Sequence, residues 1–211
     1  MMAYLALCLL GLLSSSNALL KLFSLPPSSS KVSVSELKQQ LIEKTRNTQN
    51  GIALSTSKDP GRLNEVTAII NQLNKRNRNT AISTSPLLDG TWKLAFTTNT
   101  GSSAGKLGPL VGSVVQEIYF LNSPQYYINK VLLLNGLVEA ALTADWTIKS
   151  KDLWEVNFKE IQFKVLGIPL VKKELKATGI WRLTYCDNDM RILYAKGGKN
   201  VTQENVYILF K

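Results

Sequence analysis

Apolar residues recur along the chain with two different spacings, and the change of spacing divides it into a helical part and a stranded part. Up to about residue 78 they recur every three or four positions, as on one face of an α-helix. From residue 88 onward apolar and polar residues alternate, as in strands with one buried face. The pattern predicts two helices followed by a β domain.

Both predicted helices have start signals. Ser33-Val34-Ser35-Glu36 is a capping-box pattern that begins a helix running to about Thr48, with Gly51 available as its left-handed stop. Asp59-Pro60 supplies an N-cap and a first-turn proline for the second helix, whose apolar stripe is Leu63, Val66, Ile69, Ile70 and Leu73. Because this stripe is narrow, we expect the second helix to pack on another part of the protein with one face and not to be a core helix.

The stranded part is expected to contain eight antiparallel strands. Asn135-Gly136 is a strong hairpin signal, and a switch of apolar parity near Lys159 and Glu160 indicates a bulge. Short connections without crossover helices favour a mainly β fold, an antiparallel up-and-down β-barrel whose interior holds side chains or one small ligand. The predicted strands are centred on residues 90–98, 114–121, 126–134, 137–148, 154–165, 176–185, 190–194 and 205–210.

Aromatic and aliphatic residues on the apolar strand faces are the candidate lining of this barrel. In one interpretation they fill the interior, and in the other they leave a cavity for a fatty acid, a prenylquinone or a carotenoid. Alternation does not separate a filled barrel from an open one, and the expectation is partial filling with a modest pocket. The candidate ligand-binding residues are Trp92, Leu94, Phe96, Trp146, Trp154, Phe158 and Trp181.

The N-terminal residues 1–30 are predicted to be a targeting presequence. Their apolar run is shorter than the ~20 residues of a membrane span, and Asn17-Ala18 follows as a cleavage site, so residues 1–18 resemble a signal peptide. Residues 19–30 are rich in serine and free of acidic residues, as in transit peptides. This two-part leader predicts import into a plastid surrounded by extra membranes, and a secreted protein is the alternative.

Composition narrows the classes of function. The 211 residues include 25 Lys and Arg, 15 Asp and Glu and no His, for a net charge of +10. Without histidine the chain has no Ser-His-Asp or Cys-His apparatus and no His-ligated metal, so binding is favoured over catalysis. The basic residues are scattered, and we expect them to attract an anionic membrane or lipid-droplet surface and not nucleic acid.

A glycine, a tryptophan and an arginine are expected to close the barrel. Gly90-Thr91-Trp92 opens the first strand and Arg191 lies near the last strands, which is the pattern of lipocalin-like barrels. First and last strands meet on closure, where a guanidinium can lie over the indole face. We therefore expect Arg191 to stack on Trp92, and Gly90, Trp92 and Arg191 to serve barrel closure.

Three segments resemble one known family. Residues 87–98, Leu-Leu-Asp-Gly-Thr-Trp-Lys-Leu-Ala-Phe-Thr-Thr, closely resemble the start of the plastid lipid-associated protein (plastid fibrillin) domain. The preceding residues 37–77 are similar to the helical lead-in of that family. Residues 184–192 match its C-terminal Tyr-Leu-Asp-X-X-Leu-Arg-Ile signature, with Cys186 and Met190 as departures. The resemblance covers residues 35–211 and implies a lipid-associated protein of thylakoids or plastoglobules.

The expected domain therefore extends over residues 31–211. It comprises a helical lead-in at 33–78 and the β-barrel at 87–211. After Ile192 the family has an Arg-Gly pair where this chain has Leu193-Tyr194, so the resemblance does not predict the geometry of the last hairpin.

Three other features have structural explanations. The glycine-rich residues 101–112 resemble a phosphate cradle, but no Gly-Lys-Ser/Thr precedes a helix, and we expect a flexible loop at the barrel mouth. Asp187 and Asp189 suit a tight turn better than acid–base chemistry. Since Cys8 lies in the leader, Cys186 has no disulfide partner and is expected to be a small buried group.

The sequence favours a non-enzymatic plastid protein that binds a hydrophobic lipid or isoprenoid molecule or associates with thylakoid or plastoglobule lipid. No catalytic residue, metal or cofactor is assigned. One alternative is a structural coat or docking scaffold for prenyl-lipid metabolism, which requires a protein partner. The others are a secreted lipocalin-like carrier and an enzyme that uses an inward-facing Asp, Glu, Tyr or Lys.

Overall fold

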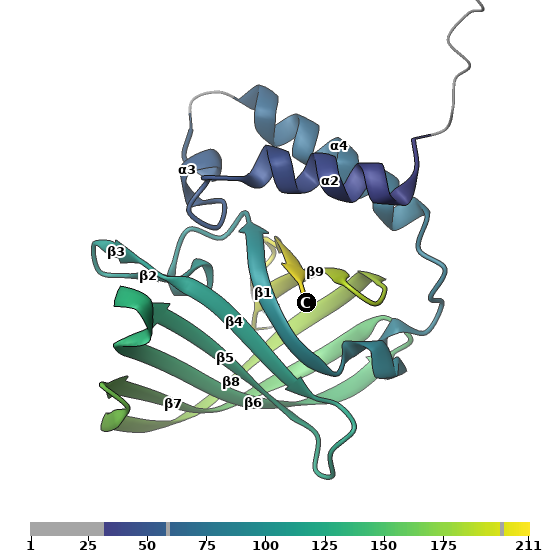
Figure 1. Cartoon of the computed structure of the whole chain (residues 1–211). Helices are drawn as coiled ribbons and strands as arrows, with labels where there is room; N and C mark the ends of the chain where they lie inside the picture. The colour runs from purple at the N-terminus through teal and green to yellow at the C-terminus, as the bar shows by residue number, and fades with distance from the viewer. Residues whose placement is uncertain (1–31, 58–59, 199–200) are drawn as a thin grey trace, which may run out of the picture. The chain divides into compact units, whose positions relative to one another are not determined.

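Eight antiparallel strands of the described chain close into a barrel, as the alternation predicts (Figure 1). The structure is a computed structural model that describes residues 32–57, 60–198 and 201–211, so the expected presequence lies outside the described residues. Around the barrel the order is β1-β10-β9-β8-β7-β6-β5-β4. Its strands are β1 (Gly90–Thr97), β4 (Ser113–Tyr119), β5 (Tyr126–Leu133), β6 (Val138–Ser150), β7 (Leu153–Val165), β8 (Ile168–Cys186), β9 (Met190–Gly197) and β10 (Asn205–Phe210).

The β5–β6 hairpin forms at the predicted residues, and the β9–β10 pairing is regular. Asn135 and Gly136 both have positive φ, 56° and 90°, and join β5 to β6 as predicted. β9 and β10 pair without interruption from Ala195 opposite Asn205 to Met190 opposite Phe210, so the departure after Ile192 leaves this pairing regular. β8 begins at Ile168, well before the predicted residue 176. Its first half pairs with β7 alone and is therefore an edge of the sheet. Edge strands tolerate proline and lysine, so the residues before 176 did not look like a strand.

The predicted bulge lies at Lys159. On β6 the neighbours Thr143 and Ala144 pair with Glu160 and Phe158, which leaves Lys159 as the extra residue. The pairing of β7 with β8 shifts at the same place. The extra residue bends β7 and lets the long strands curl toward closure.

A second bulge, in β1, corrects one expected lining residue. The register of β1 against β10 shifts between Leu94 and Phe96, so that Ala95 is the extra residue. Trp92 and Leu94 belong to the apolar cluster inside the barrel, whereas Phe96 packs with the helices on its outer face. The expectation that Phe96 shares the face of Trp92 and Leu94 is therefore wrong, because one inserted residue reverses the side on which every later side chain lies.

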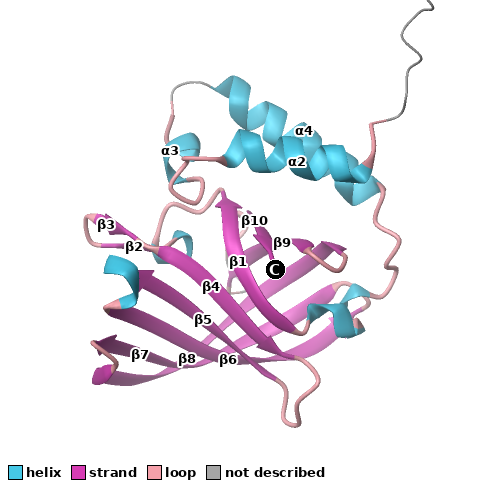
Figure 2. Ribbon diagram, viewed as in Figure 1, coloured by secondary structure: helices cyan, strands magenta, loops and turns pink. Residues whose placement is uncertain are grey.

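The helices cover the outer face of β1, β9 and β10 (Figure 2). They are α2 (Val34–Thr45), α3 (Ile52–Ser55) and α4 (Pro60–Lys75), and the expected N-cap Asp59 lies outside the described residues. None of the helices in the described part of the chain is long and apolar enough to span a membrane. The buried residues of the helices and of the outer strand faces form one apolar cluster, which contains Leu37, Leu41, Leu54, Val66, Ile69, Ile70, Leu73, Phe96, Tyr185, Met190, Ile192, Val206 and Ile208.

Two short 3₁₀ helices connect the helical part to β1 and reach the barrel interior. They are η1 (Ile82–Thr84) and η2 (Pro86–Leu88). The indole Nε1 of Trp154 donates to the Ser83 carbonyl at 3.0 Å, and that of Trp92 donates to the Leu88 carbonyl at 2.8 Å. Ile82 and Leu88 belong to the interior cluster, so this segment closes the barrel at the end where β1 begins.

The glycine-rich segment is structured. It forms η3 (Ser102–Ala104) and the small hairpin of β2 (Lys106–Leu107) and β3 (Leu110–Val111). The side-chain amide of Asn50 donates to the carbonyls of Ala104 and Gly112, at 2.9 and 2.8 Å. The loop after α2 thus holds the segment where the sequence analysis expected a flexible loop.

Asp187 and Asp189 form a turn between β8 and β9, as predicted. Asp187 Oδ1 accepts hydrogen bonds from the backbone N–H groups of Asp189 and Met190, at 3.2 and 3.0 Å. Lys38 of α2 forms ion pairs with both carboxylates, at 2.6 Å from Asp187. The turn therefore also fastens α2 to the barrel.

We predict that Gly51→Ala lowers the free energy of unfolding by roughly 2–4 kcal/mol. Gly51 has φ +104°, and an added Cβ would lie 2.1 Å from the Thr97 carbonyl oxygen of β1. The backbone there cannot retreat without breaking the 2.8 Å hydrogen bond from Thr97 N–H to the Asn50 carbonyl. Urea unfolding followed by tryptophan fluorescence measures the loss.

Gly136→Ala is the matched control for this substitution. Gly136 also has positive φ, +90°, but an added Cβ meets no atom within 4 Å. We expect it to cost about 1 kcal/mol, for the strained backbone alone. Equal losses for the two variants would contradict the close approach of Gly51 to β1.

The ion pair of Asp187 predicts a loss of stability in acid. Burial alone would raise the pKa of this carboxyl, but the hydrogen bonds from Lys38 and Tyr185 outweigh burial and lower the pKa to about 2. Since the ordinary value is about 3.9, the stabilisation is complete above about pH 4 and is lost as the pH falls toward 2. Asp187→Asn should be less stable at pH 6 and lose less stability than the unaltered protein between pH 4 and 2.

Urea unfolding at a series of pH values tests this expectation. Asp152→Asn serves as the control, because the Asp152 carboxylate bonds only its close neighbour Ser150 among the described residues. If Asp187→Asn keeps the same acid dependence as the unaltered protein, the ion pair does not stabilise the fold.

Candidate functional site

The barrel is hollow at the end where β9 leads into β10. A cavity of about 310 Å³ lies there. Its apolar wall comes from β6 to β9, with Leu142, Phe158, Trp181, Leu193 and Ala195. Its mouth is lined by polar or small residues, namely Asn99, Ser103, Lys196, Gly197 and Asn205. A concave space with an apolar wall and polar groups at defined places is typical of small-molecule sites.

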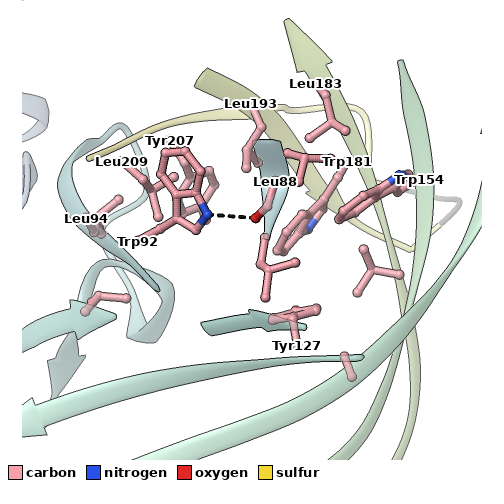
Figure 3. Packing of buried hydrophobic residues seen from close by; sticks show 14 of the residues in the cluster. Leu88, Trp92, Leu94, Tyr127, Trp154, Trp181, Leu183, Leu193, Tyr207 and Leu209 are labelled. Atoms are coloured by element: carbon pink, nitrogen blue, oxygen red, sulfur yellow. Dashed lines mark hydrogen bonds between the residues drawn. The ribbon is translucent and has the colours of Figure 1, made fainter. Parts of the chain in front are cut away.

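Stacked aromatic rings fill the other end of the barrel. Trp146 and Trp154 stack with ring centroids 4.3 Å apart, and Trp154 and Trp181 follow at 6.4 Å. Tyr127 lies 5.0 Å from Trp181, and both residues line the cavity. Figure 3 shows Tyr127, Trp154 and Trp181, and on the other side of Leu88 the ring of Trp92 with its hydrogen bond to the Leu88 carbonyl. The aromatic layer is thus the base of the cavity, and the barrel is half filled and half open.

The cavity has a polar wall as well as an apolar one. Gln116 of β4, Tyr127 and Asn129 of β5 and Tyr207 of β10 all line it. Gln116 and Tyr127 are almost fully buried, and Asn129 Oδ1 is a buried acceptor without a partner in the described structure. Burial raises the pKa of the Tyr127 hydroxyl well above its usual range, so this group stays protonated.

Arg191 lies directly behind this polar wall. It extends from β9 into the barrel with its Cζ 5.0 Å from the ring centroid of Trp92, the contact expected from the sequence. Its Nη2 donates to the side-chain oxygen of Gln116. Burial lowers the pKa of the guanidinium to about 9, which leaves it charged at neutral pH.

Gly90 has φ +113° and is the first residue of β1, the strand that pairs with both β4 and β10.

The structure separates the seven expected lining residues into three groups. Phe158 and Trp181 line the cavity. Trp92, Leu94, Trp146 and Trp154 lie within or against the interior cluster away from the cavity wall, and Phe96 lies on the outer face. The prediction from hydrophobicity alone thus named aromatic residues of the cavity base more often than residues of the cavity wall.

The polar residues of the wall were not among the ligand-binding residues predicted from the sequence. Gln116 alternates with the buried Val114 and Ile118, and Asn129 lies between Tyr127 and Val131 on the same face of β5. A polar residue at an inward position of an apolar strand face was the available signal. It marks a place where burial costs free energy unless a partner is supplied.

The polar residues that line the cavity carry amide, phenol, hydroxyl and ammonium groups, and none of the described lining residues is a carboxylate. Burial raises the pKa of the Cys186 thiol to about 11, so this residue is the small buried group that was expected. Among the described residues no group of three or more Cys, Asp and Glu side chains could hold a metal ion.

Comparison with known proteins gives one match. The PAP_fibrillin family model matches residues 35–202, which include nearly all of the helical part, β1 to β9 and the cavity residues from Asn99 to Gly197. Neither the curated proteins nor the solved structures contain a match to this chain. The family match covers most of the chain and agrees with the motifs at residues 87–98 and 184–192. The chain therefore belongs to the PAP_fibrillin family, whose members are plastid lipid-associated proteins.

Proposed function

We propose that this protein binds a small apolar molecule in its barrel and holds it without transforming it. The observation that carries the proposal is the cavity of about 310 Å³ between an apolar wall and an aromatic base. Broad apolar walls give most of the affinity for a lipid, and a few polar groups orient it. Membership of a plastid lipid-associated family supports the same function.

The size of the cavity favours some ligands over others. About 310 Å³ is near the lower limit of ligand pockets, which range over roughly 300–1,000 Å³. A single acyl chain, or the ring of a prenylquinone with its first prenyl units, suits this space. A whole carotenoid exceeds it, so a carotenoid would have to leave most of its length outside the mouth.

The proposed location is a plastid, at thylakoid or plastoglobule lipid. The two-part leader predicted at residues 1–30 and the family membership support it. Secretion is the alternative address. Mass spectrometry of the mature N-terminus separates the two, since a start at Leu19 indicates secretion and a start near Ser30 indicates plastid import.

Filling the cavity should abolish binding without unfolding the protein. Ala195 of β9 lines the cavity, and Ala195→Phe places a ring in the space that the ligand needs. We expect at least a tenfold weaker affinity for a fatty acid or plastoquinone, measured by displacement of the neutral fluorophore N-phenyl-1-naphthylamine. The control is Ala68→Phe, which adds the same ring on the exposed side of α4.

Unchanged affinity in Ala195→Phe would place the ligand elsewhere. If the unaltered, delipidated protein binds neither the fluorophore nor any of these lipids saturably, the proposed function is wrong.

A second candidate function, association with a lipid surface, is favoured by exposed apolar side chains at two hairpin tips. The β5–β6 and β7–β8 hairpins project from the same end of the barrel (Figure 1) and are joined by a 2.8 Å hydrogen bond from Leu166 N–H to the Leu137 carbonyl. Their large apolar side chains are 51–69% exposed, and we call them the apolar tip: Leu134, Leu137, Leu166, Ile168, Leu170 and Val171. Exposed apolar side chains gathered at one end of the barrel in this way favour an interaction site.

The position of basic residues favours a lipid surface as the partner of the apolar tip. Lys172 and Lys173 follow Val171 on β8. At about 3.3 Å per strand residue, they lie roughly 13–17 Å behind Ile168, the first residue of β8. Amphipathic segments enter a membrane interface to a depth of about 5–10 Å, so these ammonium groups would lie outside the inserted residues and face the lipid head groups.

Removing apolar side chains from the tip should weaken binding to vesicles. We expect Leu166→Ser combined with Ile168→Ser to reduce sedimentation with phosphatidylcholine–phosphatidylglycerol vesicles at least tenfold, because each buried side chain of this size contributes about 1.5–3 kcal/mol. Leu121→Ser is the matched control, since Leu121 is 70% exposed and Leu166 69%. Leu121 lies in the β4–β5 connection, at the opposite end of the barrel.

Two results would count against this surface. Equal effects of the tip and Leu121 variants would contradict its part in lipid association. Self-association that only the tip variants abolish, measured by sedimentation velocity, would assign the surface to a second copy of the chain.

A further inference from the structure

Arg191 is a buried cation inside an apolar barrel. Its neighbours on β9, Met190 and Ile192, belong to the cluster under the helices, so Arg191 faces the interior. The side chain is 1% exposed. Trp92 covers one face of the guanidinium, and Gln116 accepts the hydrogen bond from Nη2. Few cations are buried so completely without a paired anion.

The guanidinium lacks a counter-charge among the described residues. Arg191 takes part in none of the ion pairs formed by the described residues. Its Nε and Nη1 are buried and make no hydrogen bond in the described structure. Tyr127 and Cys186 are the titratable groups that act on its charge, and burial raises the pKa of both, so they are neutral at pH 7. A buried charge in this state is costly and is normally paired.

The nearest polar neighbours of Arg191 line the cavity. Gln116 contacts both, since its side-chain oxygen accepts from Arg191 and its side chain forms part of the cavity wall. Tyr127, close enough to act on the Arg191 charge, is also part of the wall. A ligand that reaches the polar wall of the cavity therefore contacts side chains that are themselves neighbours of the unpaired guanidinium.

We propose that the cavity takes an amphiphile with a carboxylate head group, which enters first and becomes the counterion of Arg191, with Gln116 as its neighbouring hydrogen-bond donor. The inference rests on the proposed function and names its ligand class. A carboxylate accepts the fork of guanidinium N–H groups and brings the single negative charge that one guanidinium needs. The apolar chain then lies along Trp181, Phe158 and Leu193 toward the mouth.

Lys196 offers the opposite orientation and so provides the control. It lines the mouth of the same cavity. A carboxylate held there would leave the chain end against Tyr127 and Trp181, and Arg191 would stay unpaired. Substituting the two cations one at a time separates the two orientations.

The test compares three ligands with the same chain on the delipidated full-length protein. Dodecanoate, dodecanol and dodecyl phosphate are titrated at pH 7.5 by displacement of N-phenyl-1-naphthylamine. We expect dodecanoate to bind at least tenfold more tightly than dodecanol. Arg191→Met should remove this preference, and Lys196→Met should retain it.

Each other result would overturn a particular part of the proposal. If dodecanol binds and dodecanoate has no advantage, the head-group assignment is wrong while the proposed function stands. If neither ligand binds, the proposed function itself fails. A preference lost in Lys196→Met and kept in Arg191→Met reverses the orientation, and tighter binding of dodecyl phosphate replaces the carboxylate by a phosphate.

A measurement on the unaltered protein keeps the proposal testable if Arg191→Met does not fold. Nuclear Overhauser contacts of bound dodecanoate report which end is near the base of the cavity. The proposal requires contacts from the methylene next to the carboxylate to the ring of Tyr127. Contacts from the terminal methyl group to that ring would overturn it.

Discussion

The pairing of β1 with both β4 and β10 is the constraint on which the rest of the structure depends. Closure pairs β1 on both sides and divides the strand residues into an inside and an outside. β1 serves both sides, because the bulge at Ala95 turns the strand so that Trp92 lies inside and Phe96 outside. The outside then carries an apolar patch over β1, β9 and β10, which α2 and α4 must cover. The helical part is thus a consequence of how the barrel closes.

Inside the barrel the same closure creates a space that side chains fill only at one end. The stack of Trp146, Trp154 and Trp181 anchors the closed end, where indole groups bond to the segment before β1. At the other end the wall contains Gln116 and Asn129, and Arg191 lies behind it without a counter-charge in the described structure. A protein selected for stability alone would place apolar residues there. Polar groups held at a cost beside a cavity are the observation on which the proposed ligand site rests.

Local patterns predicted those features that local forces decide. The hairpin at Asn135-Gly136 follows from residues that tolerate positive φ, and the bulge at Lys159 follows from a parity switch within one strand. The stripe of α4 has one buried face whatever covers it. The bulge in β1 left no such trace, because Phe96 is apolar and suits either an interior or a helix-covered face. The hydrogen bonds of Asn50 to the glycine-rich segment join residues far apart in the sequence and have no local signal.

The sequence by itself determined the class of fold, the order of helices and strands, the family and the contact of Arg191 with Trp92. Each depends on periodicity, on turn residues or on motifs, which are properties of neighbouring positions. The tertiary structure alone decided which end of the barrel is open, which residues form the cavity wall and that Arg191 lacks a counter-charge there. These depend on strand register and on the volumes of side chains from eight strands together. Alternation is the same in a filled and in a hollow barrel, so only the packed structure distinguishes them.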